Sequence, residues 1–273
     1  MRQSGILLAL IATALCAQDG QKGSRPEWPC VAGRAVDPSY IETSESSGGQ
    51  LFLFQKNEVG HASLFMSASF THPATVLRAV GSLSGSRDFE FPVDSRMESM
   101  LVMASLQCRS GIQVSRPNGV EVTVANSARN VDLQAGRIVR IDSPESGTWR
   151  VRLTGTGLFV LSVVAKTDLK LAGVSFFAAG EDGARLIQPV LGVRQNLEAH
   201  VGGEVSNLKF HAIGPTGELM SDLDATEANA NGTYRFEMTP PAERFRIVVT
   251  GTDAMACPFQ RTYPNLFRAE PPK

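Results

Sequence analysis

The stretch SPESGTWRVRLTG, residues 143–155, combines a turn signal, a tryptophan and an alternating strand. Pro144 to Gly147 supplies the proline and glycine that favour a tight turn. In the TWRVRLT that follows, the apolar side chains share one face with Trp149, and the two arginines take the other face. This is the period of a half-buried β-strand. The stretch therefore predicts a hairpin whose Trp149 lies in the core under a β-sheet.

The same alternation returns further along the chain. TYRFEM (233–238) opposes apolar side chains to an arginine and a glutamate, and RFRIV (244–248) places Arg244 and Arg246 on the predicted polar face. Turn signals separate runs of this kind at 117–119, 144–147, 214–217 and 231–232. Short strands punctuated by turn residues predict an all-β fold built of antiparallel β-sandwiches.

The length of 273 residues is enough for two such domains in tandem. We expect the seam near Lys166 to Ala172, because roughly 100 residues, an ordinary domain size, remain on either side. Residues 67–167 then form the first sandwich, 168–265 the second, and 266–273 a tail. A helical pattern is confined to Gln55 to Ser67.

The N-terminus has the features of a secretory signal peptide. Arg2 precedes an apolar run that ends at Ala17 and is too short to span a bilayer. Residues 1–17 are therefore expected to be removed, which leaves a secreted chain with no membrane insertion. A lipoprotein anchored through Cys16 is disfavoured, because the preceding Leu15 is bulky where a small residue is expected.

The overall charge argues against two classes of partner. The net charge is −1 and the basic residues are scattered along the chain. Nucleic acids and anionic lipid surfaces require clustered positive charge, so neither is expected as a partner.

The cysteines also fit the expected export to an oxidising compartment. Cys30, Cys108 and Cys257 remain after signal cleavage, and an oxidising environment favours pairing. Their spacing does not choose the pair. One bridge plus one leftover thiol is favoured over three separate buried thiols. None of the three belongs to a CxxC or Cys/His cluster, so zinc is disfavoured.

A search for catalytic residues gives none. No histidine has the spacing of a metal ligand or a cysteine or carboxylate beside it; the histidines are His61, His72, His200 and His211. His211 alternates with apolar neighbours and is expected to be exposed on a strand. GSLSG (81–85) is not a nucleophile elbow, because Leu83 stands where the central serine is needed. We therefore expect a protein that is not an enzyme.

Two polar features suggest other roles. Four aspartates fall near strand ends, where turn capping is favoured and a calcium site is the weaker alternative; they are Asp94, Asp132, Asp142 and Asp168. No other cofactor is expected. Asn231-Gly-Thr233 is an N-glycosylation sequon in a predicted turn of an exported chain. In a eukaryote we expect Asn231 to carry a glycan, and in a bacterium to form a plain turn.

Several short motifs, taken in order, resemble the N-terminal region of hemicentins and related extracellular proteins built on a von Willebrand factor A domain. They are IETSESSGGQLFLFQKNEV (41–59), FEFPVD (89–94), IQVSRPNG (112–119), NVDLQAGRIVRIDSPESGTWRVRLTGTG (130–157) and VVTGTDAMACPFQR (248–261). In that family an A domain precedes a galactose-binding-like sandwich and then an Ig-like domain. The resemblance covers about Ile41 to Pro264 and implies a galactose-binding-like jelly roll followed by an Ig-like sandwich.

The chain departs from that pattern at its beginning. It is too short before Ile41 for an A domain, so residues 18–66 are interpreted as a leader with a remnant of an A-domain end. Asp37-Pro-Ser39-Tyr-Ile41 lacks the second serine of the metal-ion-dependent adhesion motif D-x-S-x-S. Metal-dependent adhesion is therefore not inferred.

Three function hypotheses remain. The first is a secreted non-enzymatic binding or structural module of the extracellular-matrix or cell-adhesion type, with extracellular proteins or cell-surface glycans as partners. The second is a lectin-like carbohydrate-binding protein, with or without calcium. The third and weakest is a hydrolase or its accessory domain. The sequence identifies neither a particular ligand nor an oligomeric state.

Overall fold

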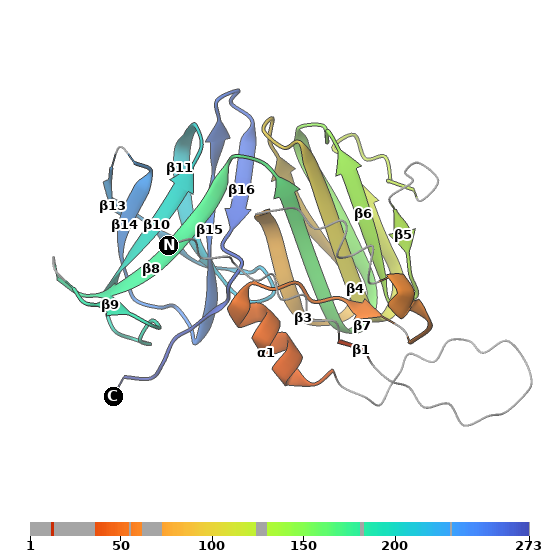
Figure 1. The fold of residues 1–273 in the computed structure, drawn as a ribbon, viewed down its shortest axis with the longest axis horizontal. Coiled ribbons are helices and arrows are strands. Elements are labelled where there is room, and N and C mark those ends of the chain that lie inside the picture. The colour runs from red at the N-terminus through yellow and green to blue at the C-terminus, as the bar shows by residue number, and fades with distance from the viewer. Residues whose placement is uncertain are drawn as a thin grey trace, which may run out of the picture.

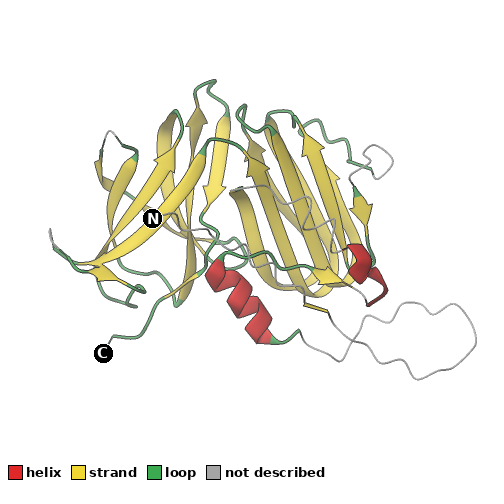
Figure 2. Ribbon diagram, viewed as in Figure 1, coloured by secondary structure: helices red, strands yellow, loops and turns green. Residues whose placement is uncertain are grey.

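The computed structural model describes residues 12–13, 36–54, 56–61, 73–123, 130–180, 183–229 and 231–272. The chain is almost entirely β-structure, arranged as two antiparallel β-sandwiches in tandem, as the sequence predicts (Figure 1, Figure 2). The first sandwich is built from β3 (Ala74–Val93), β4 (Ser99–Ser115), β5 (Val131–Asp132), β6 (Gly136–Asp142) and β7 (Gly147–Lys166). The strands that follow are β8 (Lys170–Ala178), β9 (Arg185–Leu186), β10 (Gln195–Gly202), β11 (Val205–Ile213), β12 (Leu219–Leu223), β13 (Ala225–Ala228), β14 (Thr233–Met238), β15 (Arg244–Asp253), β16 (Pro258–Thr262) and β17 (Phe267–Arg268).

The first sandwich is a single bent sheet in the order β3-β7-β4-β6-β5. Phe89 on β3 pairs with Val151, and Phe159 on β7 pairs with Gly81, eight residues along the same ladder. Nevertheless the Phe89 and Phe159 rings lie 5.5 Å apart between centroids. The sheet must therefore fold back on itself, so that the two halves of each long strand enclose one core.

Glycine makes this bend possible on β7. Gly155 has φ +146°, and a Cβ there would lie 2.1 Å from the carbonyl oxygen of Cys108. No larger residue fits at such a distance, because the backbones approach too closely. Opposite it, β4 shifts register between Leu106 and Cys108 and again between Arg109 and Gly111. Bulges of this kind bend and twist a strand.

A short segment before β3 covers the outer face of this sheet. Phe54 of β2 (Leu53–Phe54) and Phe52 just before it form a second apolar cluster with residues of β4, β6 and β7. The segment 51–54 is fully buried, and β2 pairs in parallel with β1 (Ala12–Thr13). Residues 51–54, part of the expected leader, therefore pack on the first sandwich.

The second sandwich has two separate sheets, β13-β14-β10-β8-β9 and β12-β11-β15-β16, with β17 beside β15. Aromatic rings join them: Phe210 on β11 lies 4.6 Å from Phe236 on β14, between ring centroids. Phe176 on β8 meets Phe245 on β15 edge to face at 6.1 Å. These contacts fill the space between two facing sheets.

The expected tail takes part in this second unit. β17 pairs with β15, Ala269 is buried, and Glu270 forms a bridge with Val190. Residues 267–270 therefore extend the second sandwich. The seam lies between the end of β7 at Lys166 and the start of β8 at Lys170.

Helix α1 (Pro38–Ser47) begins and ends at recognisable caps. Asp37 accepts a hydrogen bond from the Ser39 backbone N–H at 2.9 Å, and Pro38 occupies the first turn. Gly48 ends the helix in the left-handed conformation, φ +69°. The expected helix at 55–67 is instead a 3₁₀ turn at Lys56–His61, and residues 62–67 lie outside the described residues. Within the described ranges, no helix has the length and apolarity needed to cross a membrane.

Trp149 is fully buried in the first core, at 0% exposure. Its indole Nε1 donates to the carbonyl oxygen of Glu145 at 2.9 Å, which ties the strand to the turn before it. Arg150 and Arg152 lie on the opposite, exposed face and form ion pairs with Glu90 and Asp88.

Truncation of Trp149 tests its position in the core. We expect Trp149→Ala to lower the free energy of unfolding by about 3–5 kcal/mol, because it leaves a cavity and an unpaired carbonyl. Arg152→Ala on the exposed face is the control and should cost at most about 1 kcal/mol. Chemical denaturation measures both. A loss below about 1 kcal/mol for Trp149→Ala would be incompatible with a core tryptophan.

Candidate functional site

The two sandwiches meet along strand β3, at the edge of the first sheet (Figure 1). The Val76 carbonyl oxygen accepts hydrogen bonds from the side chains of Gln260 and Thr262 on β16, both at 3.0 Å. Further along β3, the Val80 backbone N–H donates to Pro215 of the 214–217 turn at 2.9 Å. Edge-strand polar groups of the first sandwich are thus satisfied by the second.

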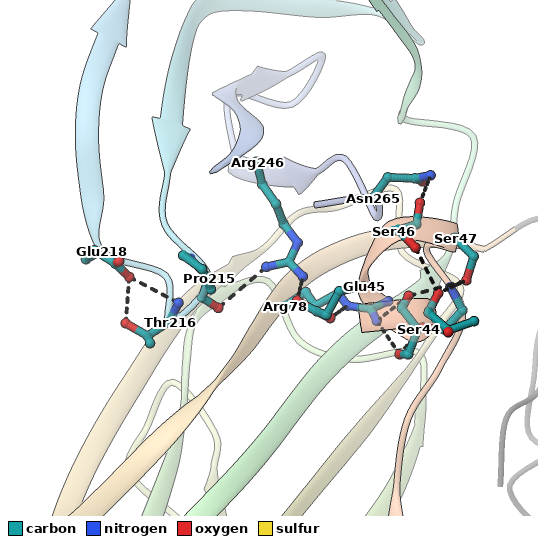
Figure 3. A network of polar contacts seen from close by, with 12 residues as sticks. Ser44, Glu45, Ser46, Ser47, Arg78, Pro215, Thr216, Glu218, Arg246 and Asn265 are labelled. Atoms are coloured by element: carbon teal, nitrogen blue, oxygen red, sulfur yellow. Dashed lines mark hydrogen bonds and ion pairs between the residues drawn. The ribbon is translucent and has the colours of Figure 1, made fainter. Parts of the chain in front are cut away.

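A buried ion triad joins helix α1 to both sandwiches. Glu45 accepts from Arg78 Nε on β3 at 2.8 Å, and its other carboxylate oxygen pairs with Arg246 Nη2 on β15. All three side chains are at most 4% exposed. Figure 3 shows the two guanidinium groups converging on Glu45 from opposite sides. Arg78 is further held by the carbonyl and hydroxyl oxygens of Ser44.

The charges of the triad do not balance, because two cations share one anion. Burial lowers the pKa of Arg246 to about 10, since the charged form loses hydration; Glu45 opposes this shift and Arg78 adds to it. Within the described residues, Arg78 Nη1 and Arg246 Nε have no hydrogen-bond partner. Removing the carboxylate would leave both arginines buried without the anion that they share.

A second buried pair lies further along the junction. Arg261 on β16 donates to Asp94 at 2.7 Å and to the Leu169 carbonyl oxygen at 2.8 Å. Its guanidinium and the carboxylate are at most 1% exposed, and burial lowers the pKa of Arg261. This pair joins the end of β3, the seam and β16.

Asp253 ties the β15–β16 turn to the first sandwich. One carboxylate oxygen accepts from the backbone N–H and hydroxyl of Ser95, at 2.9 and 2.6 Å, and the other accepts from the N–H groups of Met255 and Cys257. Burial raises the pKa of Asp253, but these hydrogen bonds outweigh it and hold the pKa below its ordinary value.

A pocket of about 200 Å³ lies at this junction. We call it the junction pocket. Strand β3 contributes Leu77 and the run from Arg87 to Glu90, and the second sandwich contributes Ile213, Gly217, Val248 and Gln260. Neither sandwich alone supplies the pocket, because its walls come from both.

The polar groups of the junction pocket are fixed by their neighbours. Arg87 Nη2 donates to the Thr216 carbonyl oxygen at 3.0 Å, and its guanidinium lies 4.7 Å from the centre of the Phe89 ring. Both carboxylate oxygens of Asp88 accept hydrogen bonds from Arg152, at 2.6 and 2.7 Å. These hydrogen bonds lower the pKa of Asp88.

One sequence prediction at the junction is wrong. Arg246 was expected on a solvated strand face, but it is 0% exposed, because α1 and the first sandwich cover that face of β15. His211, expected to be exposed, is only 20% exposed at its side chain; Nδ1 lies 2.7 Å from Asp222 and Nε2 3.3 Å from Thr250.

The other histidines do not form a site with His211. His200 is exposed on β10, and its Nδ1 lies 3.5 Å from the Thr233 hydroxyl. His61 ends the 3₁₀ turn, and His72 lies outside the described residues. Among the described ranges, no three His, Cys, Asp or Glu residues gather in a way that could hold a metal ion.

The four aspartates near strand ends each pair with a different arginine and do not converge. The pairs are Asp94 with Arg261, Asp132 with Arg109, Asp142 with Arg140, and Asp168 with Arg96. The hydrogen-bonded Arg96 guanidinium lowers the pKa of Asp168. Asp94 also accepts from the Arg96 backbone N–H at 3.0 Å, which is the turn-capping role expected of it.

The modification candidates are placed as follows. Cys257 is a free, partly exposed cysteine, Cys108 is not free, and Cys30 lies outside the described residues. Asn231 is exposed in the turn before β14. Disulfide pairing and glycosylation stay predictions.

Sequence reasoning missed the residues that build the junction: Glu45, Arg78, Arg87, Gln260 and Arg261. A signal existed for Arg78, a lone charge inside the apolar run ATVLRAV (74–80). A buried charge needs a partner, but the run does not say which residue supplies it.

Residues 74–168 match a family model described as the hemicentin galactose-binding domain-like family. The match runs from the first residue of β3 to just beyond β7, so it covers the first sandwich. It supports that part of the resemblance to hemicentins, and it does not extend to an A domain or an Ig-like domain. No curated protein matches the chain.

Solved structures give weaker likenesses. A Bacillus licheniformis lipase in its propeptide form is similar at a TM-score of 0.37 and 14% identity, over 73% of this chain and 44% of that one. A DUF4785 family protein from Legionella pneumophila has a TM-score of 0.37 and 9% identity, over 72% and 66%. The adhesin domain of Epf from Streptococcus pyogenes has a TM-score of 0.23 and 10% identity, over 73% and 78%. The chain thus spans less than two thirds of the first two structures, and likeness at these scores carries no functional argument.

Neutralising Glu45 tests the triad. We expect Glu45→Gln to lower the free energy of unfolding by about 3–5 kcal/mol, because two buried arginines lose their counter-ion. Glu42→Gln on the same helix is the control: Glu42 pairs with Arg268 at the surface, at 3.0 Å, and its loss should cost at most about 1 kcal/mol. Urea denaturation compares the two. Equal, small losses would show that Glu45 does not hold the junction.

Proposed function

We propose that this chain is a secreted, non-enzymatic binding or structural module of the extracellular-matrix or cell-adhesion type. The observation that carries the proposal is the match of residues 74–168 to the hemicentin galactose-binding domain-like family. By the same resemblance, the second sandwich would correspond to the Ig-like domain that follows it. Its partners would be extracellular proteins or cell-surface glycans.

The junction between the sandwiches supports a binding role. Two buried ion pairs and the bonds from β16 fix the two sandwiches against each other. A rigid pair of domains presents a binding surface at a lower entropy cost than two domains on a flexible linker. The arrangement suits a module that recognises a partner across both sandwiches.

Binding to candidate partners tests this proposal. Purified residues 18–273 should show saturable binding to one or more members of a panel of matrix proteins and cultured cell surfaces. A β-sandwich of unrelated origin serves as the matched control. An activity screen against esters, peptides and glycosides should show no turnover. Binding no stronger than the control across the whole panel would contradict the proposal, and turnover would contradict its non-enzymatic part.

A second candidate function is lectin-like carbohydrate binding, with or without calcium. It is favoured by the junction pocket, where Arg87, Glu90 and Gln260 offer polar groups beside the buried Phe89. A glycan array probed in calcium and in chelator distinguishes it from protein recognition. An array with no bound glycan in either condition would remove this candidate.

Export would bring two covalent features. We propose one disulfide bridge between Cys30 and Cys108, a pairing that the free Cys257 supports, and an N-glycan on Asn231 in a eukaryotic source. Peptide mass mapping of the alkylated, secreted protein should find Cys257 alkylated without prior reduction. Asn231→Gln should lose one glycan mass, and Asn207→Gln, which changes an asparagine outside any sequon, should not. Alkylated Cys30, or unmodified Asn231 from eukaryotic cells, would refute the respective part.

A further inference from the structure

We propose that the junction pocket binds one neutral hexopyranoside ring without a metal ion. This inference rests on the proposed binding function and names a ligand class and a site for it. The residues that carry it are Arg87 and Glu90 of β3 and Gln260 of β16.

The size of the pocket limits the ligand to something small. Its volume is about 200 Å³, whereas pockets for drug-sized ligands occupy about 300–1,000 Å³. One sugar ring is compatible with this space, and an extended peptide or an oligosaccharide inside it is not. Any further sugar units of a longer saccharide would extend out of the pocket into solvent.

The pocket presents donors and acceptors side by side. One nitrogen of Arg87 is bound to the Thr216 carbonyl oxygen, and a guanidinium has five N–H donors. Gln260 uses its NH₂ group on Val76, which leaves its carbonyl oxygen as an acceptor. Each hydroxyl of a sugar both donates and accepts, so adjacent hydroxyls match a guanidinium and an amide oxygen together.

Glu90 adds a second acceptor. Arg150 binds one of its carboxylate oxygens, at 2.7 Å through Nη2 and 3.0 Å through Nε. The contacts of Arg150 fall on Oε1, which leaves Oε2 for a ligand donor. Charge-assisted hydrogen bonds of this kind are stronger than neutral ones.

The paired carboxylates of the pocket disfavour a cation as its ligand. Asp88 and Glu90 are already paired with Arg152 and Arg150, so neither carboxylate is an uncompensated anion that would attract a cation. Arg87 is the remaining cation, and it faces the Phe89 ring at 4.7 Å. Beside these groups, the buried side chains of Ile213 and Val248 provide an apolar wall for the C–H face of a sugar ring.

The test uses residues 18–273 and four probes at millimolar concentration in EDTA: methyl β-galactopyranoside, methyl β-glucopyranoside, methyl α-mannopyranoside and methyl β-N-acetylglucosaminide. Saturation-transfer NMR detects binding, and titration gives Kd. The variants are Arg87→Lys, which keeps the charge but loses the fork of donors, and Glu90→Gln. The matched control is Glu237→Gln, an exposed strand glutamate paired with Arg194 on the far sheet. Thermal melting confirms that each variant folds.

We expect at least one probe to bind saturably in EDTA, with Kd raised about tenfold in Arg87→Lys and in Glu90→Gln and by less than about twofold in Glu237→Gln. Absence of transfer from all four probes, or a Kd that neither pocket variant changes, would overturn the inference. The matrix and cell-surface panel is run on the same preparation. Binding there without sugar binding defeats this inference alone, whereas no binding in either assay defeats the proposed function as well.

Discussion

Glu45 lies on a ten-residue helix, yet its two carboxylate oxygens pair with arginines from two different sandwiches. Arg78 lies 33 positions after Glu45 in the chain, and Arg246 lies 168 positions after Arg78. No other contact described at the junction joins α1, β3 and β15 at once. This carboxylate therefore couples the placement of the helix to that of both sandwiches.

The triad links the two sandwiches, but burying its charges costs desolvation free energy. Two guanidinium groups lose their hydration and share one anion, which is why the pKa of Arg246 falls to about 10. Buried ion pairs of this kind contribute little net stability compared with apolar packing of the same volume. At this junction they favour one relative placement of the two sandwiches over others. Any displacement of the sandwiches separates Glu45 from an arginine that is 1% exposed or less.

Period-two alternation was enough to predict the all-β fold and the face of Trp149, because that strand has one face in the core and one in water. The same rule failed at Arg246, because both faces of β15 are covered and alternation no longer separates buried from exposed residues. Helix α1 had its caps in the sequence, at Asp37 and Gly48. It was missed because its buried face consists of Ser44 and Glu45, which gives no apolar stripe.

The junction pocket could not be predicted for a related reason. Its walls come from two sandwiches whose contact depends on long-range ion pairs, and no local pattern encodes such a contact. This origin couples ligand binding to domain arrangement. A ligand that contacts Arg87 and Gln260 together binds only while the sandwiches are docked, so it must stabilise the docked state by mass action. By the same linkage, a change that loosens the triad should weaken the proposed binding in the pocket, even though Glu45 is not among the residues that line it.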